Sequence, residues 1–150
     1  MRRFFAFFVT TALVIFGAGT SPAQAVPAVG PVACLNDASS GITGSGSFTV
    51  AADASGYSIT LSATCVGLAV VPDGVTNLGY GSFSDSTGLT SIEIPASVAS
   101  IDSRAFDNAT ALTRITVDSA STNYSTIDGV LFTKSLATEE LFKYPAAKGT

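Results

Sequence analysis

Few side chains in this sequence could carry chemistry. The 150-residue chain has no histidine and two cysteines, and its charged groups are eleven Asp or Glu and seven Lys or Arg. Without histidine it has no side chain whose ordinary pKa suits a base near neutral pH. Glu139 and Glu140 are adjacent, so their carboxylates would not converge on one substrate, and Asp118 and Asp128 lack the spacing of a calcium loop. The sequence therefore predicts no enzyme, no catalytic residue, no cofactor and no metal site.

The two cysteines have a structural interpretation. Two thiols are too few ligands for a zinc site in a chain without histidine. In an oxidising compartment, a bridge between Cys34 and Cys65 would persist. Closing a loop of this length would stabilise the fold by about 3–4 kcal/mol in the entropic model. The sequence favours this disulfide, and two free thiols are the alternative.

Residues 1–25 predict export. Arg2 and Arg3 precede an apolar run from Phe4 to Phe16, and small residues around Ala25 suit cleavage, as in a secretory signal peptide. An uncleaved anchor is the alternative, although the apolar run is short for a bilayer. Removing both arginines changes the net charge from −4 to −6, because five Lys or Arg then face eleven Asp or Glu. Such a chain is expected to be secreted or held at the cell surface, with no nucleic-acid partner and no membrane insertion after signal removal.

A repeat of 23 residues predicts the architecture. Residues of similar type recur at this spacing in Pro72 and Pro95, Val75 and Val98, Leu78 and Ile101, Phe83 and Phe106, Leu89 and Leu112, Ile92 and Ile115, and Ile94 and Val117. A period of 20–29 residues with Leu and Ile at fixed offsets is typical of leucine-rich repeats, whose units form successive coils of a solenoid. The fold class is therefore a leucine-rich-repeat solenoid of about two to three coils, with short parallel strands and short helical turns.

Each coil is expected to add one strand, or rung, to a parallel sheet. The predicted core comprises Phe83, Leu89, Ile92, Ile94, Val98, Ile101, Phe106, Leu112, Ile115 and Val117. The side chains of opposite parity form the candidate binding face, which comprises Leu68, Val70, Ser91, Glu93, Arg114 and Thr116. Glu93 and Arg114 either contact each other or remain solvated. Leu68 and Val70 are either covered by a preceding hairpin or begin an exposed apolar patch.

Other patterns divide the rest of the chain. Residues 26–46 are rich in Gly, Ala, Pro and Ser, which predicts a flexible linker. Alternating apolar residues in 47–65 predict a β-hairpin that caps the first coil, and the coils follow in 66–117. In 118–150, Asp128-Gly129 between two apolar runs predicts a hairpin insert, with a further strand at 141–144 and a truncated end.

These residues resemble one family. The run from Leu89 to Pro95, continued by Val98, Ile101 and Phe106, is similar to the unit of BspA-like leucine-rich repeats, and residues 124–147 resemble the insert that punctuates them. The resemblance covers about residues 66–147. It implies a right-handed solenoid in a family of secreted or cell-surface proteins associated with adhesion, and it supplies no catalytic motif.

The functional expectation is a non-catalytic module that binds a protein or glycan at a cell surface, either complete or as a fragment of a longer repeat protein. Two alternatives stay open. One is a structural spacer or remnant without its own ligand. The other is self-association through the C-terminal end, where an uncapped repeat would leave an unprotected strand edge.

Overall fold

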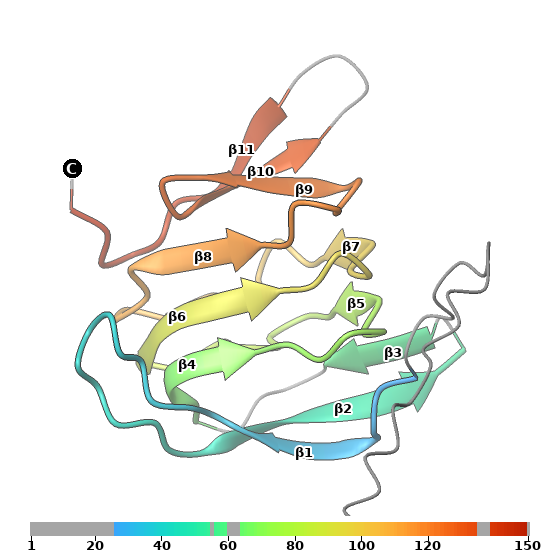
Figure 1. Ribbon diagram of the computed structural model, residues 1–150, viewed down its shortest axis with the longest axis horizontal. Coiled ribbons are helices and arrows are strands. Elements are labelled where there is room, and N and C mark those ends of the chain that lie inside the picture. Colours follow the sequence, from blue (N-terminus) through green and yellow to red (C-terminus); the bar gives the residue numbers. More distant parts are fainter. Residues whose placement is uncertain (1–25, 55, 60–63, 135–138, 150) are drawn as a thin grey trace, which may run out of the picture.

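The computed structural model describes residues 26–54, 56–59, 64–134 and 139–149, and these form eleven strands in three sheets. The predicted signal peptide and Leu61 of the hairpin lie outside the described residues. The strands are β1 (Gly30–Ala33), β2 (Ser47–Asp53), β3 (Gly56–Ile59), β4 (Val66–Val70), β5 (Asn77–Leu78), β6 (Gly88–Ile94), β7 (Ser100–Ile101), β8 (Arg114–Val117), β9 (Tyr124–Ile127), β10 (Val130–Lys134) and β11 (Glu139–Lys143). Figure 1 shows them stacked in successive layers from β1 and β2 at one end to β11 at the other.

The rungs β4, β6 and β8 form a parallel sheet in that order. Its register repeats the sequence period, because Ile92 lies opposite Ile115 and Ala69 lies opposite Ile92. Branched apolar residues suit this pleated, half-buried surface. Rung β6 stops at Ile94, because the following Pro95 has no backbone N–H to continue the ladder.

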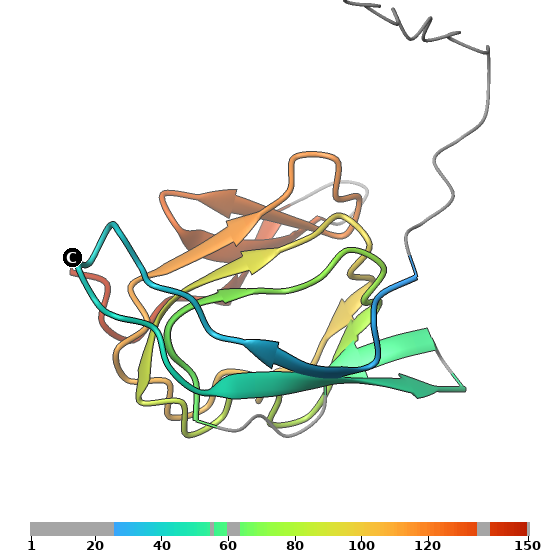
Figure 2. The same ribbon diagram turned by 60° about the horizontal axis from the view of Figure 1, so that its bottom comes forward.

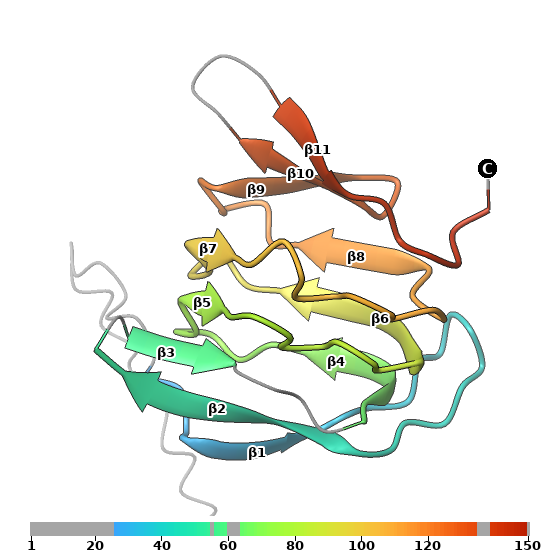
Figure 3. The ribbon, with the colours of Figure 1, turned by 180° about the vertical axis from the view of Figure 1, so that it is seen from behind.

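A second sheet faces the rungs across the core. Its order is β1-β2-β3-β5-β7, and β5 and β7 are parallel with Leu78 opposite Ile101, again 23 residues apart. Figure 3 shows β3, β5 and β7 as successive layers on this side. The chain therefore passes from one sheet to the other and back once per repeat, and each such circuit is a coil. The predicted hairpin forms between β2 and β3, and β3 covers the first coil by pairing with β5.

The predicted helical turns are absent from the described part of the chain. The segment 103–108 instead forms successive turns, with bonds such as the Asp107 N–H to the Arg104 carbonyl at 3.3 Å. Asn108 has φ +57°, and Asp85, its equivalent one coil earlier, has φ +58°. A residue in this left-handed conformation cannot continue a right-handed helix, and short polar side chains tolerate it best. The sequence pattern located the turn correctly but overestimated its regularity.

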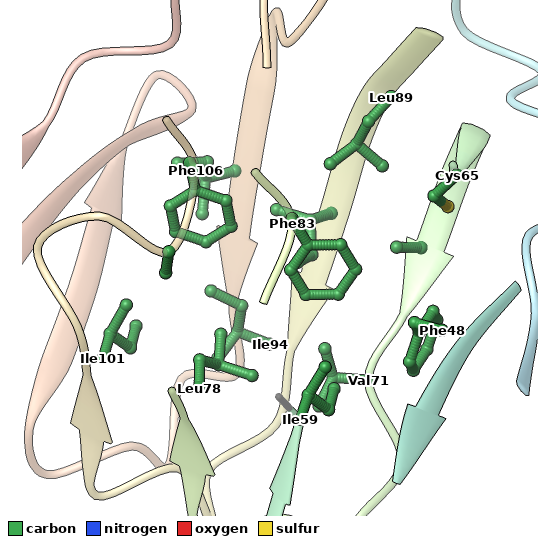
Figure 4. Close-up of a cluster of buried hydrophobic side chains, with 14 of the residues drawn as sticks. Phe48, Ile59, Cys65, Val71, Leu78, Phe83, Leu89, Ile94, Ile101 and Phe106 are labelled. Atoms are coloured by element: carbon green, nitrogen blue, oxygen red, sulfur yellow. The ribbon is translucent and has the colours of Figure 1, made fainter. Parts of the chain in front are cut away.

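A continuous apolar core joins the coils. All ten predicted core residues are buried except Val117, which is partly buried and packs against the cluster. The rings of Phe83 and Phe106 stack with centroids 6.0 Å apart, and Phe48 of β2 meets Phe83 edge to face at 5.3 Å. Figure 4 shows these three rings in one line through the core. Phe48 therefore extends the aromatic stack of the repeats into the N-terminal hairpin.

The prediction that residues 26–46 form a flexible linker was wrong. Residues 30–33 form β1, which pairs with β2, and the backbone of Leu35 exchanges two hydrogen bonds with Leu68 at the edge of β4. Cys34 and Cys65 form a disulfide between this segment and the start of β4. Composition suggested a linker because Gly, Ala, Pro and Ser are frequent there, but the glycines allow close backbone contact. A Cβ on Gly46, for example, would collide with the carbonyl oxygen of Thr64.

The C-terminal segment forms a three-stranded antiparallel sheet, in the order β11-β10-β9. Its hairpin turns at Asp128 and Gly129, as the sequence predicts, and β11 pairs with β10. The sheet stacks on the last rung, since Ile115 donates a backbone hydrogen bond to the Gly129 carbonyl at 2.9 Å. The hydroxyl of Tyr124 accepts a hydrogen bond from the Ile101 N–H at 2.9 Å, which satisfies one backbone donor at the outer edge of β7. Within the described residues, no helix is long and apolar enough to cross a membrane.

Candidate functional site

The six residues of the candidate binding face form two rows across the rungs. Strand register places Leu68, Ser91 and Arg114 side by side in one row. It places Val70, Glu93 and Thr116 side by side in the other, two residues further along each rung. The two rows have different surroundings. We call the row of Leu68, Ser91 and Arg114 the covered row, and the row of Val70, Glu93 and Thr116 the open row.

The covered row runs beside residues 35–39, which we call the strap; of its members Ser91 is buried, Leu68 is half-buried and Arg114 is exposed. Successive odd-numbered strap residues each contact one member of the row. The backbone of Leu35 bonds to Leu68, the carboxylate of Asp37 accepts from the Ser91 hydroxyl at 2.8 Å, and the Ser39 hydroxyl accepts from the Arg114 guanidinium at 3.2 Å. In Figures 1 and 2 the segment after β1 passes beside the starts of the rungs before it returns to β2.

The strap corrects two expectations for the face. Ser91 was expected to face solvent, but it is 2% exposed, so a partner could not reach it without displacing Asp37. Leu68 and Val70 are half-buried, and it is the strap rather than the hairpin that borders Leu68. Three of the six face residues therefore make contacts within the chain.

Asp37 is the best-connected polar side chain of this region. One carboxylate oxygen accepts from the Ser39 N–H at 3.0 Å and from its hydroxyl at 2.6 Å, and the other accepts from the hydroxyls of Thr90 at 2.7 Å and Ser91 at 2.8 Å. Burial alone would raise the pKa of this carboxyl, but the hydrogen bonds together outweigh that effect. They hold the pKa of Asp37 well below its usual value of 3.8. Asp37 is therefore a buried anion that fastens the strap to β6.

The sequence offered no direct signal for the role of Asp37. It lies 53 and 54 positions before Thr90 and Ser91, outside the region that repeats. The three small residues that follow it, Ala38, Ser39 and Ser40, were interpreted as part of a linker. A lone acidic residue next to serines is the only local signal, and such a signal is equally typical of an exposed turn.

The open row borders a groove of about 220 Å³ at the carboxyl ends of the rungs. Its lining residues are Val70, Val71, Asp73, Glu93, Ile94, Pro95, Thr116 and Asp118. The apolar members include Val71, Ile94 and Pro95, which are buried, while the three carboxylates and Thr116 are exposed. All three members of the open row thus belong to one concave surface.

Among the described residues, no Lys or Arg lines this groove or forms an ion pair with its carboxylates. Within the described residues the one ion pair joins Lys143 to Asp107 at 3.9 Å, so Glu93 and Arg114 do not pair. Arg114 instead reaches back to the strap. Asp118 accepts a hydrogen bond from the Ala120 N–H at 2.8 Å, a local turn contact that leaves its charge in place.

The lining residues of the groove define the chemistry that it offers. Across the part of the chain that the structure describes, no three Asp, Glu or Cys side chains are grouped so that they could hold a metal ion. The groove residues offer three carboxylates, the hydroxyl of Thr116 and apolar surface. The groove therefore presents three carboxylates beside apolar side chains.

The fold is that of a leucine-rich repeat protein, because the repeats stack in register, two sheets flank one core and the rungs share a face. A family model described as "BspA type Leucine rich repeat region (6 copies)" matches residues 63–143. The chain therefore belongs to the BspA-type leucine-rich repeat family, as the resemblance in the sequence implied. A search of curated proteins finds no match.

Two solved structures are similar to this chain. A leucine-rich repeat protein from Eubacterium ventriosum is 31% identical over 57% of this chain and 22% of its own, with a TM-score of 0.51. A leucine rich cell surface protein from Faecalibacterium prausnitzii is 31% identical over 55% of this chain and 27% of its own, with a TM-score of 0.40. The matched region thus makes up about a quarter of each of those proteins.

Proposed function

We propose that this chain is a non-catalytic binding module that works outside the cytoplasm, in which a short solenoid presents its open row to a partner protein. The observation that carries this proposal is the groove along Val70, Glu93 and Thr116, where three stacked rungs contribute to one concave surface. Stacked strands of repeat proteins offer extended surfaces of this kind to partners. The disulfide Cys34–Cys65 supports an oxidising location.

The location can be tested by expressing the full chain in a bacterial host and separating medium, envelope and cytoplasm. We expect the chain outside the cytoplasm, with its cysteines oxidised and its new N-terminus close to Ala25. A chain that stays in the cytoplasm with Met1 or Arg2 at its terminus and both thiols reduced would contradict the proposed location.

Binding can be tested with arrays of surface proteins and of glycans, using the exported chain as it is purified. We expect saturable binding to a protein, and we expect Thr116→Arg to abolish it, because a long charged side chain would then occupy the groove. Thr122→Arg is the matched control, since Thr122 is also an exposed threonine but lies outside both rows. Equal binding by both variants, or binding to glycans alone, would contradict a role for the open row in protein recognition.

A structural spacer is the second candidate function. The specific observation in its favour is the strap, which uses the covered row for contacts within the chain. A spacer predicts no saturable ligand on either array and no difference between the Thr116→Arg and Thr122→Arg variants in any cellular phenotype. Self-association would be recognised separately, as a concentration-dependent increase in sedimentation coefficient.

A further inference from the structure

The groove beside the open row is lined by negatively charged side chains, and this charge indicates which class of partner it could bind. Asp73, Glu93 and Asp118 lie around it, and no Lys or Arg is among its lining residues. Arg114, the one cation of the candidate face, is held at the covered row by Ser39. A concave surface lined by one sign of charge attracts ligands of the opposite sign. The groove is therefore complementary to positive charge.

The spacing of the carboxylates does not suit a single metal ion as the occupant of the groove. If the three acids converged on a point, they would form a candidate site for a metal ion, but the described residues contain no such group. Each carboxylate instead faces solvent at a different place around the groove. An occupant that matches this pattern carries several positive charges spaced along its length.

The groove also has an apolar floor. Val70 is half-buried at the end of β4, and Ile94 is buried at the end of β6. Lysine and arginine combine a long apolar stem with a charged head, and they lay the stem on apolar surface while the head remains in water. Such side chains match both features of the groove, whereas an anionic glycan or a second copy of this acidic chain would meet repulsion, since the net charge is −4.

We propose that the groove binds an extended basic segment of the partner protein, with lysine or arginine stems on Val70 and their charges facing Asp73 and Glu93. This inference rests on the proposed function and names the chemistry of its partner. Direct contacts between such exposed charges are individually weak. Affinity therefore depends on several of them acting together, and it falls as the salt concentration rises.

The test is an NMR titration of the isotope-labelled exported chain with capped hexalysine and hexa-arginine peptides. We expect saturable shifts of the amide signals of Val70, Glu93 and Thr116. The pair Asp73→Asn and Glu93→Gln should weaken binding about fivefold or more, as two lost charge contacts imply. The control pair Asp128→Asn and Glu140→Gln changes the net charge equally at exposed sites outside the groove, and it should weaken binding less than about twofold.

Three results would overturn the inference. Shifts scattered over the surface, or equal weakening by both pairs of substitutions, would indicate diffuse charge attraction. Equal shifts with hexa-(Nε-acetyl)lysine would show that positive charge is not what the groove recognises. The failure of this inference can be distinguished from failure of the proposed function, because array binding that is unaffected by the Asp73 and Glu93 substitutions contradicts only the basic segment.

Discussion

At the scale of single residues, Asp37 shows how a buried charge can be stabilised by neutral neighbours. The carboxylate is 2% exposed and has no cationic partner among the described residues, yet four hydrogen bonds from Ser39, Thr90 and Ser91 satisfy both of its oxygens. Hydrogen bonds to a charged group are stronger than those between neutral groups. The charge of Asp37 is therefore part of what holds the strap on β6.

Replacing this carboxylate tests its contribution. We expect Asp37→Asn to reduce the free energy of unfolding at pH 7 by about 1–3 kcal/mol, because the amide retains one acceptor but loses the charge. Asp128→Asn is the control, since Asp128 is exposed and asparagine also tolerates its φ of +50°, and it should change stability by less than about 0.5 kcal/mol. Urea unfolding of the full chain measures both. Equal effects of the two substitutions would contradict the buried anion.

The same residue predicts how stability depends on pH. The pKa of Asp37 is lower in the folded chain than its usual value of 3.8, so the unfolded chain binds more protons there. Its contribution is complete well above pH 3.8 and is lost as the pH falls through that value toward the lower pKa of the folded state. The difference in stability between wild type and Asp37→Asn should therefore shrink on acidification. A difference that stays constant between pH 7 and pH 3 would contradict this account.

At the scale of elements, the N-terminal segment depends on glycines that allow its backbone to lie against β4. Gly46 and Gly41 both have φ in the left-handed region, at +80° and +70°. A Cβ on Gly46 would collide with the Thr64 carbonyl, whereas a Cβ on Gly41 would meet nothing within 4 Å. A comparison of substitutions at Gly41 and Gly46 therefore separates the free-energy cost of an unfavourable φ from that of a steric collision.

Alanine substitutions at these two glycines exploit that difference. We expect Gly41→Ala to cost about 1–2 kcal/mol for the left-handed conformation alone. Gly46→Ala should cost about 1–3 kcal/mol more, because the backbone around Thr64 must move. Thermal melts of the oxidised chain measure both values. If the two substitutions prove equally costly, the close approach of this segment to Thr64 does not exist in solution.

The elements also show what sequence patterns can predict. The rungs were predictable because Ile92 and Ile115 recur with the period that strand pairing then uses. The C-terminal hairpin was predictable because Asp128-Gly129 is a local turn signal. The strap was not, since Asp37 binds residues more than 50 positions away and belongs to no repeat. Three of the predicted face residues, Leu68, Ser91 and Arg114, consequently contact the strap.

At the scale of the whole molecule, the aromatic stack links the N-terminal hairpin to the repeats. Phe106 is 2% exposed and stacks on Phe83, which in turn contacts Phe48. Repeat proteins derive their stability from contacts between neighbouring units, so the loss of one shared side chain weakens the whole array. The stack should therefore be a major source of cooperativity.

Deleting one ring tests this expectation. Phe106→Ala should reduce the free energy of unfolding by about 3–5 kcal/mol, as for other large aromatic deletions in cores. Tyr80→Ala is the control, because Tyr80 is 62% exposed and its ring contacts Arg104, an interaction worth about 1 kcal/mol or less at an exposed site. Calorimetry of the two variants measures the difference, and a loss below 1 kcal/mol for Phe106→Ala would mean that its ring is not part of a shared core.

The strap occupies one row of the rung face and leaves the other open, and carboxylate footprinting can measure this difference. Carbodiimide coupling of glycine ethyl ester to the native full chain, read by mass spectrometry, measures the access of reagent to each acid. We expect Glu93 and Asp73 to react at least about tenfold faster than Asp37, which becomes accessible only when the strap opens locally. In the denatured chain, the three rates should become similar. Labelling of native Asp37 as fast as Glu93 would contradict the account.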